Sequence, residues 1–180
     1  FFQKIMTLLG NIESGNQILD AGCGNGSFGM WLLSLFSTDP CFCNFHYTGA
    51  DFVPDALAYG QKTHHDIIQK IKQDGNRINP LFAYNVVDLT KRLPFMDDYF
   101  DHVCSNLVIS YLPDPTFTLT ELVRVLKPGR RIVVTSIKPN PDFSQIYRGL
   151  IEKCKTPQEF EASRKLLDNA AGLSERESHG

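Results

Sequence analysis

Hydrophobic and polar positions alternate with two different periods along the first three quarters of the chain. Short apolar runs, several ending in an acid or a turn, predict five strands: 17–20, 45–50, 81–87, 100–109 and 131–137. Apolar residues at helical spacing predict helices between them: 2–9, 28–36, 54–73 and 115–126. Strands that alternate with helices predict an α/β fold, with a parallel sheet covered on both faces.

The predicted helices come with expected inner faces and boundaries. Asp114 and Pro115 suit a helix start, and Lys127-Pro128-Gly129 a helix end. The inner positions that we expect are these: Ile67, Ile68 and Ile71 in the third helix, and Leu119, Leu122, Val123 and Leu126 in the fourth.

The chain is predicted to have two parts. Residues 1–140 form the sheet-containing core, and residues 141–180 form a helical tail. Apolar residues between Phe143 and Cys154 have helical spacing, and Thr156-Pro157-Gln158-Glu159 has the pattern of a capping box. No further strand is predicted after residue 137.

Composition narrows the possible partners. The chain has 180 residues, a net charge of −2 and no apolar run long enough to cross a membrane, so neither a nucleic acid nor a membrane span is expected. Five cysteines in no regular framework favour a reduced, cytoplasmic protein. Their spacing does not match a zinc site, so no metal is expected.

Three predicted strands in succession end in, or are followed by, an acidic residue that could bind a ligand: Asp20, Asp51 and Asp88. Parallel sheets bind ligands at this edge. Residues 24–29 match the dinucleotide pattern G-x-G-x-x-G, which leaves an NAD(P)-dependent oxidoreductase open. However, Asp20 just before the turn would repel a pyrophosphate, and Asp51 comes later than that pattern expects. A cofactor with a cationic amino acid end, a ribose and no phosphate fits better.

At these motifs the chain resembles class I methyltransferases that depend on S-adenosyl-L-methionine (SAM), of the small-molecule group that includes the ubiquinone/menaquinone-biosynthesis type. The resemblance covers about residues 15–140 and rests on these segments: 19–26, 49–51, 87–89, 93–95, 100–107 and 126–129. It implies a Rossmann-like, doubly wound, mostly parallel sheet. The resemblance also implies that the tail, 141–180, covers the acceptor side of the site. The family fold ends in an antiparallel strand pair that we do not find, so we expect that this chain stops before that pair, which leaves its catalytic competence an open question.

The resemblance implies a set of cofactor-binding residues: Asp20, Gly22, Cys23, Gly24, Gly26, Asp51, Phe52, Val87, Asp88, Leu89, Ser105 and Asn106. The glycines would let the backbone approach the methionine part, because no Cβ intrudes. Asp20 would stabilise the amino group, directly or through water, or would merely cap the turn. Asp51 would accept both ribose hydroxyls.

The remaining roles concern the adenine and the methionine end. Phe52 would lie against the adenine, and Leu89 beneath it. Asp88 would accept from the exocyclic amine, or would be a solvated loop acid. Ser105 and Asn106 would line the methionine end, largely through backbone.

No catalytic base can be assigned from the sequence. Tyr111 is expected either at the acceptor site or in a packing role. His102 is expected to be structural, and three further histidines are expected at surface or strand positions: His46, His64 and His65.

The predicted function is methyl transfer from SAM to a small molecule, with S-adenosyl-L-homocysteine (SAH) as product. The segment 105–108, Ser-Asn-Leu-Val, lacks the Asn/Asp-Pro-Pro-aromatic run of enzymes that methylate amino groups of DNA bases or glutamine. A non-catalytic SAM-fold fragment is a further alternative. The acceptor and the oligomeric state are left open.

Overall fold

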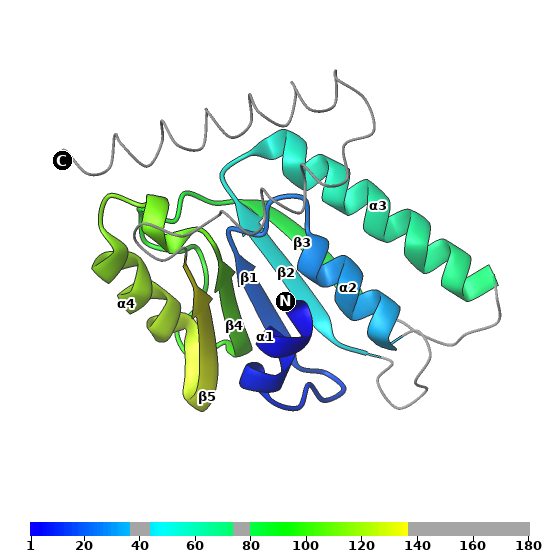
Figure 1. Cartoon of the computed structure of the whole chain (residues 1–180), viewed down its shortest axis with the longest axis horizontal. Coiled ribbons are helices and arrows are strands. Elements are labelled where there is room, and N and C mark those ends of the chain that lie inside the picture. Colours follow the sequence, from blue (N-terminus) through cyan, green and yellow to red (C-terminus); the bar gives the residue numbers. More distant parts are fainter. Residues whose placement is uncertain (37–43, 74–79, 137–180) are drawn as a thin grey trace, which may run out of the picture. The chain divides into compact units, whose positions relative to one another are not determined.

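The computed structural model describes residues 1–36, 44–73 and 80–136 (Figure 1). The predicted tail, 141–180, lies outside the described residues. The elements in chain order are α1 Phe2–Leu9, β1 Gln17–Ala21, α2 Ser27–Phe36, β2 His46–Asp51, α3 Pro54–Gln73, β3 Leu81–Val86, β4 Phe100–Asn106, the 3₁₀ turn η2 Ile109–Tyr111, α4 Pro115–Val125 and β5 Leu126–Thr135.

The five strands form one sheet in the order β3-β2-β1-β4-β5, with every neighbouring pair parallel. The predicted parallel α/β sheet is therefore confirmed. The strand order reverses beside β1, which has β2 on one side and β4 on the other. In open parallel sheets this reversal leaves a crevice at the carboxyl ends of the strands. The residues that follow β1 and β2 lie at this crevice.

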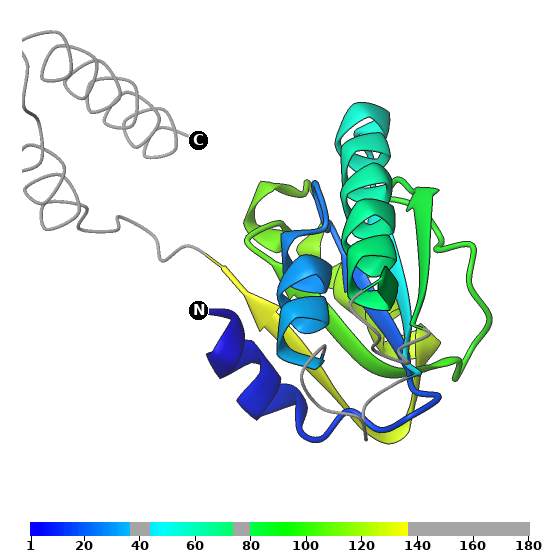
Figure 2. The ribbon, with the colours of Figure 1, turned by 90° about the vertical axis from the view of Figure 1, so that its right-hand side faces the viewer.

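Helices pack on both faces of the sheet (Figures 1 and 2). On one face, α1 and α2 bury residues such as Ile5 and Phe28 against Ile18 of β1. His64 of α3 packs on Phe82 of β3 on the same face. On the other face, α4 buries residues such as Leu122 against Leu19, the next residue of β1. Alternate residues of a strand point to opposite faces, so β1 is buried on both sides.

The start of α4 was predicted correctly, but part of its inner face was not. The carboxylate of Asp114 accepts a hydrogen bond from the Phe117 N–H at 2.9 Å, as expected of an N-cap. Val123, expected inside, is 57% exposed. Glu121 of the same helix is buried instead. Its carboxylate accepts a hydrogen bond from the Leu93 N–H at 2.8 Å and forms an ion pair with Arg124 at 2.7 Å. An ion pair, which a count of apolar residues cannot detect, thus faces the loop at residues 93–97.

The inner face of α3 also differs from the prediction. The expected isoleucines Ile67, Ile68 and Ile71 are only partly buried. The fully buried positions of this helix are Leu57, Gly60 and His64. His64 is therefore a core residue, and its expected surface or strand position was wrong.

Two strand boundaries differ from the sequence prediction. The apolar run 100–109 yields a strand only to Asn106, because Leu107 adopts a left-handed φ of 59° and turns the chain into η2. β5 begins at Leu126 rather than at Arg131. The pairing of β4 with β5 shifts register between Phe100 and His102. Residues 127–129, predicted as a helix end, lie within this irregular part of β5.

Candidate cofactor site

The glycine turn follows β1 at the carboxyl edge of the sheet. Gly22, Gly24 and Gly26 have φ values of 76°, 54° and 75°, a left-handed conformation that glycine adopts without strain. The N–H groups of Gly22 and Cys23 both donate to the carbonyl oxygen of Ala50, at 2.7 and 3.1 Å. The turn is therefore fixed to the end of β2.

The space around the three glycines differs. A Cβ at Gly22 would overlap the side chain of Val108, which follows β4. A Cβ at Gly26 would overlap the hydroxyl of Tyr84 from β3. Nothing lies within 4 Å of a Cβ at Gly24. The turn is thus packed on two sides and open at Gly24.

This packing predicts a stability cost for Gly22→Ala. The added methyl must displace Val108 and adopt a left-handed φ, which together cost about 2–4 kcal/mol of unfolding free energy. Urea denaturation measures the loss. Gly15→Ala is the matched control, because Gly15 has a φ of 83° but nothing within 4 Å of its Cβ. A Gly22→Ala loss no larger than the control's would show that the Val108 contact is not tight.

Asp51 ends β2 and faces the glycine turn. One carboxylate oxygen accepts from the Gly24 N–H at 2.8 Å, and the other accepts from the Val53 N–H at 2.9 Å. The carbonyl oxygen of Asp51 accepts from the N–H of Val87 at 2.9 Å. Each carboxylate oxygen can accept a further hydrogen bond. Asp51 therefore offers a fixed, partly exposed pair of acceptors beside the turn.

Asp20, in contrast, is buried within the sheet and 2% exposed. Its carboxylate accepts from the hydroxyl of Tyr47 at 2.6 Å and from the thiol of Cys104 at 3.5 Å. Burial raises the pKa of Asp20 from 3.8 to about 6, against the opposing effect of these two hydrogen bonds. Asp20 thus sits directly below the turn without opening onto its surface.

The raised pKa predicts a pH dependence of folding that Asp20→Asn removes. Between about pH 4 and 6 the folded protein holds a proton on Asp20 that the unfolded chain has lost. The stability contribution of Asp20 therefore falls as pH rises through this window. Between pH 4 and 7, we expect wild type to lose about 2–3 kcal/mol relative to Asp20→Asn, measured by urea unfolding. A constant difference would contradict the raised pKa.

The residues predicted to bind adenine lie beyond β3 and β2. The carboxylate of Asp88 accepts from the Thr90 N–H at 3.0 Å and hydroxyl at 2.6 Å, and these bonds hold its pKa below the usual value. Leu89 is buried in the core on the α4 side. The side chain of Phe52 is 69% exposed beside Asp51.

The end of β4 borders the turn through Val108. Ser105 is fully buried, and its hydroxyl has no hydrogen-bond partner among the described residues. The side-chain oxygen of Asn106 accepts from the hydroxyl of Thr135 at 3.4 Å. The left-handed Leu107 directs the following residue, Val108, over Gly22. Sequence reasoning named Ser105 and Asn106 but missed Val108, because the left-handed turn cannot be seen in an apolar run.

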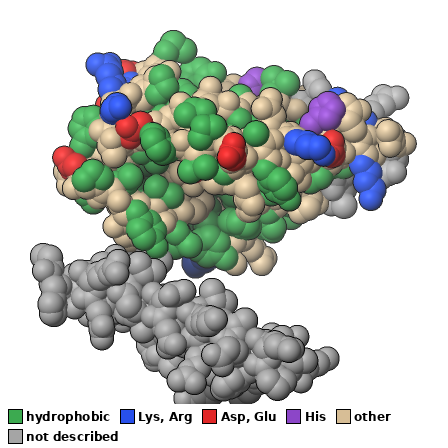
Figure 3. Space-filling model, turned by 90° about the horizontal axis from the view of Figure 1, so that it is seen from above, with side chains coloured by type: hydrophobic (Ala, Val, Ile, Leu, Met, Phe, Trp, Pro, Cys, Tyr) green, Lys and Arg blue, Asp and Glu red, His purple; other side chains and the backbone are tan. Residues whose placement is uncertain are grey.

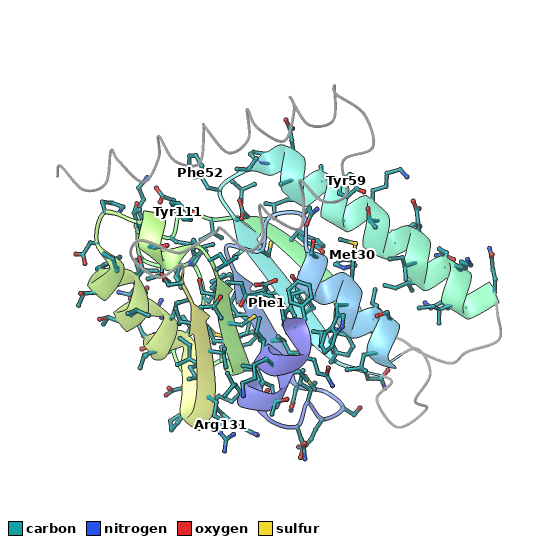
Figure 4. All side chains as sticks on the ribbon, in the orientation of Figure 1. Phe1, Met30, Phe52, Tyr59, Tyr111 and Arg131 are labelled. Carbon is teal, nitrogen blue, oxygen red and sulfur yellow. The ribbon has the colours of Figure 1, made fainter. Side chains whose placement is uncertain are left out.

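Exposed aromatic side chains lie along the same edge of the molecule. Phe52, Tyr59 and Tyr111 are 69%, 60% and 66% exposed, and Figure 4 shows them on neighbouring elements at the upper edge. Figure 3 looks onto that edge and shows apolar side chains spread across it. Tyr111 lies at the end of η2, and its role stays a prediction.

Two histidines of the described residues, His64 and His102, are buried. His102 is buried in β4, and its Nε2 lies 3.0 Å from the side-chain oxygen of Asn16, as expected for a structural residue. His64 is buried beneath the turn. In the described part of the chain, no group of three or more His, Cys, Asp or Glu side chains is placed to hold a metal ion. Also within those residues, no helix is long and apolar enough to cross a membrane.

A parallel sheet with a glycine turn after β1 and an acid at the end of β2 defines a Rossmann-like nucleotide-binding architecture. Residues 12–171 match a family described as "Methyltransferase domain", and the chain belongs to that family. This match does not favour the NAD(P) alternative.

Curated relatives refine the comparison. The chain is 32% identical over 140 residues to the demethylmenaquinone methyltransferase of Staphylococcus saprophyticus, covering 77% of this chain and 52% of the relative. It is 31% identical over 140 residues to the enzyme of the same name from Halalkalibacterium halodurans, covering 76% and 50%. The chain therefore spans about half the length of these relatives.

Solved structures support the fold. A SAM-dependent methyltransferase from Aquifex aeolicus superposes with a TM-score of 0.55 at 19% identity, covering 93% of this chain and 77% of that one. Geranyl diphosphate C-methyltransferase from Streptomyces coelicolor, solved with Mg²⁺, geranyl diphosphate and SAH, gives a TM-score of 0.58 at 19% identity, covering 90% and 57%. The described sheet is thus the class I methyltransferase fold.

Proposed function

We propose that this chain binds SAM and transfers its methyl group to a small-molecule acceptor, leaving SAH. The observation that carries the proposal is the geometry of the glycine turn: open space above Gly24, with the Asp51 carboxylate fixed beside it at 2.8 Å. A glycine without a covering side chain allows close approach of a ligand. A carboxylate with spare acceptor capacity suits a ribose diol.

The proposed cofactor contacts follow the strand ends. Asp51 holds the ribose, with Phe52 against the adenine and Asp88 near its exocyclic amine. The backbone of the turn, including Cys23, lies along the methionine part. Val87 supports Asp51 through its N–H, and Leu89 forms the buried floor on the adenine side.

The methionine end has its own proposed residues. Asp20 is too enclosed for direct contact, so its charge acts on the amino group from beneath the turn. Binding of an ammonium group would favour the charged form of Asp20, whose burial otherwise disfavours it. Ser105 and Asn106 border this end beside Val108.

SAM carries an already activated methyl group, so the protein mainly has to align donor and acceptor. The residues proposed here bind and orient the cofactor. None is assigned as a general base, which is needed only if the acceptor must lose a proton.

We further propose an apolar or aromatic acceptor, working in the cytoplasm. The exposed ring of Tyr111, on the same edge of the molecule as Phe52, supports an apolar acceptor, and Tyr111 is the proposed acceptor contact. The names of the curated relatives suggest demethylmenaquinone as the first compound to test. The free thiols of Cys23 and Cys104 support a reducing compartment.

Methyl-labelled SAM tests the catalytic part of this proposal. Incubation of the 180-residue chain with labelled SAM and demethylmenaquinone should place label in the extracted acceptor. A parallel panel of phenols and reduced quinones tests the wider acceptor class. Absence of label from every acceptor, with protein that binds SAH, would contradict catalysis and favour the non-catalytic SAM-fold fragment.

A further inference from the structure

Residues of four strands form a row across the sheet directly beneath the glycine turn. The strand register pairs Cys104 with Asp20, Asp20 with Gly49, and Gly49 with Tyr84. In-register neighbours share a face of the sheet, so all four face α2 and α3. Gly49 contributes no side chain to this row, which leaves room for its neighbour's ring.

Tyr84 fills a slot that three glycines leave open. A Cβ at Gly49 would lie 2.8 Å from the Tyr84 ring, and a Cβ at Gly60 of α3 would lie 3.2 Å from it. The third glycine is Gly26 of the turn, where a Cβ would overlap the Tyr84 hydroxyl itself. A bulky ring from β3 thus reaches under the turn, and its polar end is the atom nearest to Gly26.

His64 anchors that hydroxyl from the other side. The Tyr84 hydroxyl is hydrogen-bonded to Nδ1 of His64, and the two rings stack with centroids 5.5 Å apart. His64 is 1% exposed, and its Nε2 has no partner among the described residues. Burial lowers the pKa of His64 to about 4, so the imidazole is neutral at physiological pH.

We propose that Tyr84 and His64 are positioning residues that set the height of the glycine turn above the sheet, and thereby the affinity of the site for SAM and SAH. The inference rests on the proposed function. The turn is tied at its start to Ala50 and at its middle to Asp51. The Tyr84 hydroxyl supports its end at Gly26. Nearby, the Asn25 carbonyl oxygen would lie 2.6 Å from a Cβ at Gly60, so the turn also rests closely on α3.

A purely structural pair would affect stability alone, and calorimetry with SAH separates the two roles. Tyr84→Phe keeps the ring but removes the hydroxyl, and should raise the Kd for SAH about three- to tenfold. His64→Asn, which keeps a polar group close to the place of Nδ1, should stay nearer to wild type than His64→Leu. Tyr99→Phe is the matched control, because that ring packs on Phe100 away from the turn.

The double variant Tyr84→Phe/His64→Leu makes the distinction sharper. Removal of both polar partners leaves no unpaired group, so thermal stability should recover relative to Tyr84→Phe. The SAH affinity should remain weakened, because nothing replaces the hydroxyl under Gly26. Recovery of affinity together with stability, or an unchanged Kd in Tyr84→Phe, would overturn the inference while leaving the proposed function intact. Wild-type protein that does not bind SAH would overturn both.

Discussion

Asp51→Ala should weaken SAH binding about 100-fold or more. The substitution removes both carboxylate oxygens that we assign to the ribose hydroxyls, and hydrogen bonds to a charged acceptor contribute about 1.5–3 kcal/mol each. It also removes the acceptor of the Gly24 N–H, so the middle of the turn loses its tie to β2. Titration calorimetry of SAH with the folded variant measures the effect.

Asp55→Ala is the control for Asp51→Ala. Asp55 lies in the first turn of α3, four residues from Asp51, and its loss removes the same charge. We expect the SAH affinity of Asp55→Ala to lie within about twofold of wild type, because salt largely screens the exposed Asp55 carboxylate from the bound cofactor. An Asp51→Ala Kd as close to wild type as that of the control would remove Asp51 from the site.

Gly24→Ala should lower SAH affinity about 10- to 100-fold, while the folded state loses only the cost of a left-handed alanine. A Cβ at Gly24 meets no atom within 4 Å, so the added methyl is accommodated in the protein itself. If the cofactor lies in that space, the added methyl group collides with it and weakens the free energy of binding by about 1–3 kcal/mol. The left-handed φ of 54° adds a conformational cost to stability.

Gly129→Ala separates the two effects of Gly24→Ala. Gly129 has a φ of 74° and also nothing within 4 Å of its Cβ, but it lies near the start of β5, whereas the glycine turn follows the end of β1. Both variants should lose similar thermal stability, and only Gly24→Ala should lose SAH affinity. Equal SAH affinity in the two variants would mean that the cofactor does not lie above Gly24.

The sheet, its order of elements and the site region could be predicted because strong local signals carry them. Buried parallel strands give continuous apolar runs, and Gly22, Gly24 and Gly26 have the left-handed φ values that a glycine-rich turn suggests. Asp20 is the last residue but one of β1, and Asp51 is the last residue of the neighbouring strand β2, so parallel pairing brings both near one edge of the sheet.

Other features depend on contacts between distant residues and could not be predicted. Asp20 is predicted at the turn, but its enclosure depends on Tyr47 and Cys104, each from a different strand. Val123 is apolar enough for the core, yet it is exposed, and Glu121, paired with Arg124, is buried on α4 instead. Such pairings leave no periodic pattern in the sequence.

His64 shows the same limit in the candidate site. A histidine within the charged sequence of α3 suggests a surface residue, whereas the structure buries it under the glycine turn. The sequence held only an indirect sign of this packing. Gly49 in the middle of β2 and Gly60 in the middle of α3 lower the stability of those elements, which suggests that another group packs closely against both. Tyr84 packs closely against both glycines, and the backbone of Asn25 packs against Gly60.

The central claim is that the glycine turn and Asp51 form a SAM site, and titration calorimetry of the wild-type chain with SAH tests it most directly. We predict saturable binding of one SAH per chain, competed by SAM and unaffected by NADH. A folded sample that gives no binding heat with SAH or SAM at several temperatures would contradict the claim.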